Sequence, residues 1–271
     1  MRKLLNRYGL TGPPFSKEVA SGNLLAFADT EDIRARLRAA IEGKASAVLT
    51  GEAGVGKTCL LRSLEEDLNP SRYKVTYIHN AGVNRRDFYR QLSSALGLEP
   101  KANAAALFRQ VQTQIEELAD EQKIHPVLVL DEAQLLPVQV LEHLHVLLNF
   151  HRDSRAFLSV ILIGLPELRE RLGRNILSSL STRLPVRVHL DPLDVAQVGS
   201  YLRHRMKVSG CAQEVFSEDA LLCIREATGG VLRKIDLLAH TCLELTCEGK
   251  GTLVDGKTVQ DAVRMCAEAL R

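Results

Sequence analysis

The chain has 271 residues, enough for one large domain or for a domain with a smaller partner. Its 45% hydrophobic and 25% charged residues exclude a disordered chain, and no apolar run is long enough to span a membrane. The net charge of +2 does not by itself indicate nucleic-acid binding, and the 4% of aromatic residues without Trp argue against a stacking platform for single strands.

The cysteines and histidines indicate neither disulfides nor a metal site. Six cysteines stand singly without a C-x-x-C pair, which favours free thiols in a reducing compartment. His143 and His145 are two residues apart, so on a helix they point to different faces. The basic N-terminus has too short an apolar stretch for a signal peptide. We therefore expect a cytoplasmic protein with no membrane partner.

The N-terminal residues 1–29 are expected to form an extended segment, because Gly12, Pro13 and Pro14 break regular structure. A helix is predicted next, with Thr30 as its cap and acidic residues in its first turn. Gly43 is expected to end that helix. The segment therefore leads into the first helix of a folded domain.

Residues 30–191 alternate between predicted strands and helices. The strands are short apolar or β-branched runs bounded by breakers: Ala47–Thr50, Tyr73–Ile78, Pro126–Leu130, Phe157–Ile163 and Val186–Leu190. One predicted helix directly follows the glycine-rich loop, and three others span Arg86–Leu96, Ala104–Leu118 and Val138–Phe150. This alternation predicts an α/β domain with a parallel sheet covered by helices on both faces.

Beyond Asp191 only helical periodicity is found, so residues 192–271 are expected to form a small all-helical domain. The predicted helices are Asp194–Val208, Ser217–Ala227 with Ser217 as cap, Leu232–Cys247 and Gly256–Leu270.

A phosphate-binding loop is predicted where the sequence GEAGVGKT follows the first strand and opens a helix. Its glycines let backbone N–H groups surround phosphates, Lys57 neutralises the β- and γ-phosphates, and Thr58 offers a hydroxyl to Mg²⁺. The predicted cofactors are therefore ATP and Mg²⁺. The residues assigned to nucleotide binding are Gly51, Glu52, Ala53, Gly54, Val55, Gly56, Lys57, Thr58 and Cys59, the last packed behind the loop.

The sequence PVLVLDEAQ places two carboxylates at the carboxyl end of a buried strand. Asp131 is expected to hold Mg²⁺ through water, and Glu132 to orient the water that attacks the γ-phosphate. Gln134 has three open roles: sensing phosphate, coupling to a partner, or facing solvent. Kinase and small-GTPase signatures are absent, and about 80 residues after Asp191 are too few for a helicase's second motor domain.

Six motifs in order resemble the AAA+ ATPases: YGLTGPPFS, VLTGEAGVGKT, VLVLDEAQ, LLNF, ILIGLPELRERL and GGVLRK. Within them, the chain resembles the ExeA-like group, which includes transposition helper ATPases of the TniB, TnsC and MuB type. The resemblance implies a three-layer αβα P-loop domain followed by a helical lid.

The resemblance also implies two functional arginines. Arg183 is similar in position to the finger that reaches a neighbouring subunit's γ-phosphate, with Arg187 as the alternative. Arg233 resembles the second sensor, which contacts nucleotide from the lid, with Lys234 as the alternative. The apolar Leu165 departs from the family, where a polar first-sensor residue is common, and this bears on the hydrolysis rate.

Three functions follow from the resemblance. In the preferred one, ATP-bound subunits form a ring or filament on duplex DNA and recruit a DDE-type transposase, since the membrane span and envelope-binding region of secretion-type relatives are not expected here. The candidate DNA contacts are Arg85 and Arg86, with Lys44, Arg203, Arg205 and Lys207 behind them. The alternatives are an ATPase for secretion or cell-envelope assembly that ignores DNA, and a nucleotide switch that does not hydrolyse ATP.

Overall fold

A computed structural model describes residues 2–16, 25–79, 83–249 and 251–270. The chain divides into two compact units, which we call the sheet unit and the helical unit. The sheet unit comprises residues 29–51 and 60–190, and the helical unit comprises residues 1–28, 52–59 and 191–271. The phosphate loop therefore groups with the helical unit, and the helical unit draws on three separate parts of the sequence.

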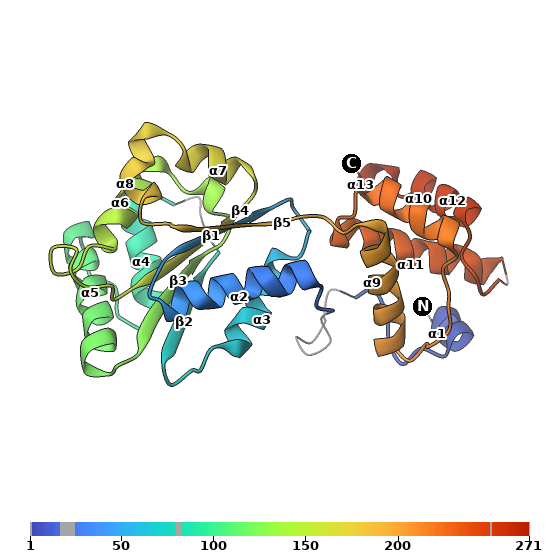
Figure 1. Cartoon of the computed structure of the whole chain (residues 1–271), viewed down its shortest axis with the longest axis horizontal. Coiled ribbons are helices and arrows are strands. Elements are labelled where there is room, and N and C mark those ends of the chain that lie inside the picture. The colour runs from blue at the N-terminus through green and yellow to red at the C-terminus, as the bar shows by residue number, and fades with distance from the viewer. Residues whose placement is uncertain (1, 17–24, 80–82, 250, 271) are drawn as a thin grey trace. The chain divides into compact units, whose positions relative to one another are not determined.

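The sheet unit is built on five parallel strands in the order β2-β3-β4-β1-β5 (Figure 1). The strands are β1 (Ala47–Gly51), β2 (Tyr73–Ile78), β3 (His125–Leu130), β4 (Ser159–Gly164) and β5 (Val186–Leu190). β1, β3 and β4 are buried throughout. The predicted parallel sheet is confirmed, and its parallel arrangement brings the carboxyl ends of all five strands to one edge.

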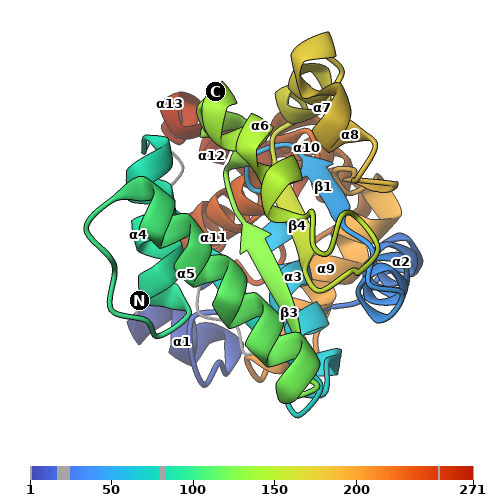
Figure 2. The same cartoon turned by 90° about the vertical axis from the view of Figure 1, so that its left-hand side faces the viewer.

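Helices cover both faces of this sheet. Its helices are α2 (Ala28–Glu42), α3 (Lys57–Asp67), α4 (Arg85–Ala95), α5 (Ala104–Glu116), α6 (Val138–Leu147), α7 (Glu167–Leu172) and α8 (Ser178–Ser181). On one face Val48, Leu128 and Leu162 share a core with α4 to α8. On the other, α2 and α3 are joined by Arg34, which bonds Ser63 and Asp67. α4 and α5 lie side by side (Figure 2). The result is the predicted three-layer αβα arrangement.

The helical unit contains α9 (Val195–Val208), α10 (Glu218–Thr228), α11 (Leu232–Glu248), α12 (Gly256–Met265) and α13 (Ala267–Leu270). Side chains cap its helices: Asp194 forms a capping box with Gln197, and Ser217 and Asp255 accept from backbone N–H groups of α10 and α12. Ser217 was predicted as a cap. The single predicted helix over 256–270 is instead broken into α12 and α13.

The extended conformation predicted for the N-terminal segment is wrong for Arg2–Tyr8, which form helix α1. Leu4 and Tyr8 are four residues apart and lie on the same face, where both are buried in the core of the helical unit. Phe15 is buried in the same core, with its ring edge-on to Phe216. The segment is thus part of the unit that contains the C-terminal helices.

Candidate nucleotide-binding and hydrolysis site

The predicted phosphate loop connects the end of β1 at Gly51 to the start of α3 at Lys57. Gly54 and Gly56 have φ angles of 84° and 107°, which side-chain-bearing residues rarely adopt. Val55 between them is buried, and it anchors the loop. The local conformation is therefore one that glycine adopts readily, as expected for a glycine-rich loop at the start of a helix.

Within the helical unit, this loop lies against the start of α11. The backbone N–H of Arg233 donates to the Gly54 carbonyl at 3.1 Å. A Cβ added to Gly54 would lie 2.8 Å from the Cβ of Arg233, and one added to Gly56 would lie 2.9 Å from Leu232 Cδ1. The alternative residue, Lys234, instead donates to the carbonyl of Leu270 at 2.6 Å. Of the two second-sensor candidates, Arg233 is the one that contacts the loop.

The charged and hydroxyl groups expected to bind Mg-ATP are the first residues of α3. Lys57 is buried and donates its ammonium to the Glu52 carbonyl at 2.8 Å. Thr58 is exposed, and Cys59 is a partly buried free thiol. A loop of backbone N–H groups, an ammonium and a hydroxyl at a helix N-terminus fit a nucleoside triphosphate with its Mg²⁺.

Asp131 ends up at the carboxyl edge of the sheet, directly after β3, and is buried. Its Oδ2 accepts from the Tyr77 hydroxyl at 2.5 Å, and its Oδ1 accepts from the Glu132 N–H at 2.8 Å. Burial and this hydrogen bond raise the pKa of Tyr77. A carboxylate held in place beside the sheet edge is a suitable ligand for a hard cation such as Mg²⁺.

Two residues near Asp131 were missed by the sequence reasoning. Tyr77 and His79 come from the end of β2, where their rings stack with centroids 6.3 Å apart, and His79 Nδ1 lies 3.7 Å from Asp131 Oδ2. The sequence signal was present, since Tyr77 lies in a strand that was predicted to its last residue, Ile78, and His79 follows that strand directly. What was missing was the pairing of β2 with β3, which sets Tyr77 opposite Val129.

Glu132 follows with a left-handed backbone, at φ 53° and ψ 37°, immediately before a helical turn over Ala133–Leu135. Its Oε2 accepts from the Gln134 amide at 2.6 Å. Gln134 is partly buried, so the alternative that it faces solvent without a protein partner is wrong.

Of the two candidate finger arginines, Arg183 precedes β5 and Arg187 lies within it, and both are bonded within the sheet unit. Arg183 pairs with Asp153 at 2.5 Å. Arg187 donates to the carbonyl and hydroxyl of Ser181, at 3.1 and 2.6 Å. Arg183 therefore has a carboxylate partner that the sequence pattern did not indicate, while Arg187 is bound to the turn before it.

Three of the candidate DNA-contacting cations, Lys44, Arg85 and Arg86, belong to the sheet unit. Arg85 and Arg86 are exposed at the start of α4, where Arg86 donates to the Ala102 carbonyl at 2.9 Å. Lys44 precedes β1, whereas Arg85 follows β2, so they lie at opposite edges of the parallel sheet. The expectation that Lys44 lies behind Arg85 and Arg86 was therefore wrong.

Arg205 is likewise unsuited to contact DNA, because it is only 7% exposed. Within the helical unit it donates to the carbonyls of Pro14 and Ser16, at 2.8 and 2.7 Å, and to the Tyr201 hydroxyl at 2.6 Å. Its guanidinium lies 3.6 Å from Asp236. Burial raises the pKa of Asp236, and the charge of Arg205 only partly offsets this effect. Arg205 therefore attaches the N-terminal segment to α9 and α11.

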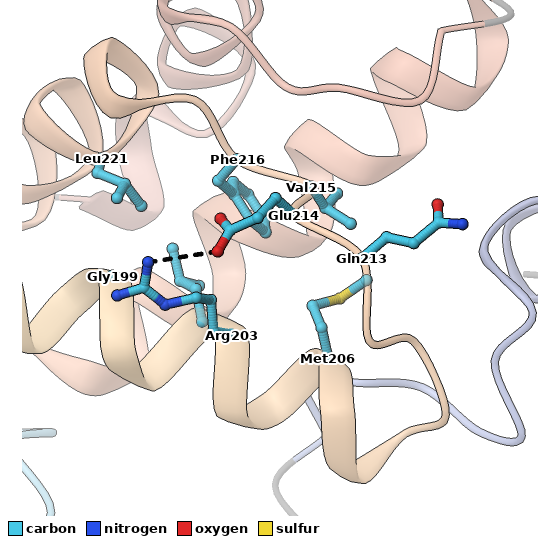
Figure 3. Close-up of a pocket in the computed structure, with 9 residues that line it drawn as sticks. Gly199, Arg203, Met206, Gln213, Glu214, Val215, Phe216 and Leu221 are labelled. Atoms are coloured by element: carbon cyan, nitrogen blue, oxygen red, sulfur yellow. Dashed lines mark hydrogen bonds and ion pairs between the residues drawn. The ribbon is translucent and has the colours of Figure 1, made fainter.

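Arg203 and Lys207, on the same helix, are exposed. Arg203 lies 3.5 Å from Glu214 at a small pocket lined by Gly199, Met206 and Phe216 (Figure 3). The pocket has room for little more than a water molecule, and none of the predicted nucleotide-binding residues lines it. It is therefore not the nucleotide site.

The part of the chain that the structure describes contains no helix long and apolar enough to cross a membrane. Among these same residues, no group of three or more His, Cys, Asp or Glu side chains could hold a metal ion. The six cysteines are free, and burial raises the pKa of Cys242 to about 12.

Residues 38–172 match the family model described as an AAA domain. Together with the parallel sheet and its helical layers, this match defines the class: residues 38–172 form a domain of the AAA+ ATPase family. The chain is 34% identical over 239 residues to general secretion pathway protein A of Aeromonas hydrophila. The alignment covers 87% of this chain but 43% of that protein, so the chain spans less than half of its relative's length.

Solved structures share the fold at low sequence identity. Cdc6p from Pyrobaculum aerophilum has a TM-score of 0.70 at 18% identity, over 93% of this chain and 70% of that one. Drosophila ORC bound to DNA has a TM-score of 0.65 at 18% identity, over 96% of this chain and 65% of that one. The similarity to the secretion protein supports the ExeA-like part of the resemblance, and the transposition part stays a prediction.

Proposed function

We propose that the chain binds Mg-ATP at the loop Gly51–Thr58 and hydrolyses it with the help of Glu132. The observation that carries this proposal is the pairing of two features: a glycine loop with positive φ angles that opens α3, and adjacent carboxylates directly after β3. Both features stand after strands of one parallel sheet, at the edge where α/β proteins bind ligands.

Each residue has a role set by its chemistry. Lys57 and the loop N–H groups bind phosphate oxygens, and Thr58 and Asp131 hold Mg²⁺. When bound, Mg²⁺ neutralises charge that develops on the phosphoryl oxygens. Glu132 orients a water molecule for attack. Arg233, on α11 beside the loop, reports the state of the nucleotide to the helical unit.

We further propose that the active assembly is an oligomer in which Arg183 stabilises the transferring phosphoryl group of a neighbouring subunit. The Arg183 guanidinium already forms an ion pair with the Asp153 carboxylate. It can exchange that partner for phosphate oxygens, which are also negatively charged. Subunit contact would then be coupled to turnover.

For the client of the ATPase, we propose duplex DNA together with a DDE-type transposase. The motif resemblance supports this assignment, as does the exposed pair Arg85 and Arg86. The fold shared with an ORC assembly bound to DNA adds support at the level of the fold alone. The second candidate is a secretion or cell-envelope ATPase that ignores DNA, and the 34% identity to general secretion pathway protein A favours it.

ATP hydrolysis and sedimentation should be measured with and without duplex DNA, at low and moderate salt, because phosphate contacts are sensitive to salt. ATP-dependent assembly on DNA supports the transposition role. Turnover that ignores DNA supports the secretion role. A chain that binds ATP without turnover is the nucleotide switch.

Variants test the individual roles in the same assays. Lys57→Ala should abolish nucleotide binding, and Glu132→Gln should bind ATP but hydrolyse it slowly. Arg183→Ala should lower turnover only where subunits meet. Replacing Arg85 and Arg86 together by Ala should weaken DNA binding, with Lys44→Ala as the matched control at the opposite edge of the sheet.

A further inference from the structure

The Gln134 side chain links Glu132 to the end of β4. Its amide nitrogen donates to Glu132 Oε2 at 2.6 Å, and its amide oxygen accepts from the Leu165 N–H at 3.1 Å. A backbone N–H can only donate, so the amide oxygen must face Leu165 and the NH₂ group must face the carboxylate. The orientation of the amide is therefore fixed by its two partners.

The place that this side chain occupies is built by its neighbours. A Cβ added to Gly164 would lie 2.6 Å from Gln134 Oε1, so glycine at the end of β4 leaves the room that the amide fills. Arg171 on α7 donates to the backbone carbonyls of Gln134 and, at 2.8 Å, of Leu136. The turn that follows Glu132 is thus held from two elements, β4 and α7.

Glu132 needs such support, because a glutamate side chain rotates about three bonds and water can attack only from one direction. The hydrogen bond from Gln134 engages Oε2, and among the described residues no group donates to Oε1. A carboxylate fixed by one oxygen presents the other in a defined direction, which is the requirement for orienting a water molecule.

We propose that Gln134 is a positioning residue for ATP hydrolysis, which fixes the Glu132 carboxylate and ties it to the end of β4. This proposal rests on the proposed function, since it gives Gln134 its effect through Glu132. The apolar Leu165 side chain offers no polar group at this strand end, and Gln134 brings an amide there from the neighbouring β3 segment.

Two variants separate the two hydrogen bonds. Gln134→Met has similar length and removes both, and kcat should fall about tenfold, the effect of losing one hydrogen bond to a charged group. Gln134→Glu keeps an acceptor for the Leu165 N–H but sets a second carboxylate against Glu132, so kcat should fall at least as far. KM and the dissociation constant of a fluorescent ATP analogue should not change. Gln139→Met, at an exposed position of α6, is the matched control and should keep normal turnover.

The variant Glu132→Gln separates failure of this proposal from failure of the proposed function. If Gln134 acts through Glu132, adding Gln134→Met to Glu132→Gln should cause no further loss of kcat. Normal turnover of Glu132→Gln would remove Glu132, and Gln134 with it, from the mechanism. If Glu132→Gln is slow but Gln134→Met keeps its kcat, the positioning role alone is wrong. A loss of nucleotide affinity and of melting temperature in Gln134→Met would likewise overturn it, in favour of a structural role.

Discussion

Acid should destabilise the sheet unit through His125. This side chain is 7% exposed, its Nε2 lies 2.9 Å from the Ser159 hydroxyl, and the ring of Tyr73 lies edge-on to it. Burial, and to a smaller extent the charge of Lys44, lower its pKa from 6.5 to about 4. The neutral imidazole is therefore the form that the folded protein accepts.

The sign of the effect follows from proton linkage. Between the folded pKa of about 4 and the unfolded value of 6.5, the unfolded chain binds a proton that the folded chain does not. The contribution to stability is therefore fully present above pH 6.5 and is lost as the pH falls. The loss is about 2 kcal/mol by pH 5 and about 3 kcal/mol below pH 4, at about 1.4 kcal/mol per pKa unit.

The measurement is urea unfolding at a series of pH values, followed by far-ultraviolet circular dichroism because the chain has no Trp. His125→Gln keeps a polar partner for Ser159 but cannot titrate, so its unfolding free energy should fall less steeply than that of the wild type. Parallel pH profiles for His125→Gln and the wild type would refute the reasoning.

Three further outcomes are expected. Gly54→Ala should destabilise the helical unit by about 1 kcal/mol more than Gly229→Ala. Both substitutions place an alanine at a positive φ, but only the Cβ at position 54 would also clash with side chains at the start of α11. Equal losses of stability in thermal melts would contradict this. Tyr77→Phe removes one hydrogen bond to the Asp131 carboxylate, so it should raise the Mg²⁺ concentration needed for nucleotide binding by about fivefold. An unchanged Mg²⁺ titration would show that Tyr77 does not help Asp131 to hold the ion. Arg205→Met should cost about 3 kcal/mol, because it removes a buried guanidinium and its hydrogen bonds to Pro14, Ser16 and Tyr201 at roughly 1 kcal/mol each. The exposed Arg203→Met should cost under about 0.5 kcal/mol, and similar urea midpoints for the two variants would show that the Arg205 contacts contribute little.

The strands were the part of the fold most accessible from the sequence. β2 and β5 were predicted to the residue, because a buried parallel strand is a short apolar or β-branched run that breakers delimit. Helix α1 was missed for the opposite reason. Seven residues that precede a Gly-Pro-Pro stretch carry little helical signal of their own, and the apolar surface that buries Leu4 and Tyr8 comes from helices about 200 or more residues later.

The candidate site divides in the same way. The loop and the two carboxylates after β3 are local motifs, so the sequence places them on their strands and helices. Two of the contacts around these carboxylates are not local, because Tyr77 reaches Asp131 through the pairing of β2 with β3, and Gln134 reaches Leu165 through the pairing of β3 with β4. Arg205 resembled an exposed cation for the same reason, since its acceptors lie far away in sequence.

The hydrogen bond from Arg205 to the carbonyl of Pro14 spans 191 residues, and this distance has a consequence during translation. At a synthesis rate of roughly 5 to 20 residues per second, the ribosome needs about 10 to 40 s to make the intervening chain. Throughout that time Leu4, Tyr8 and Phe15 have no core to enter, while the sheet unit can already fold between them and their destination. The N-terminal segment is thus an apolar stretch of the nascent chain that a holdase can bind until α9 and α11 emerge.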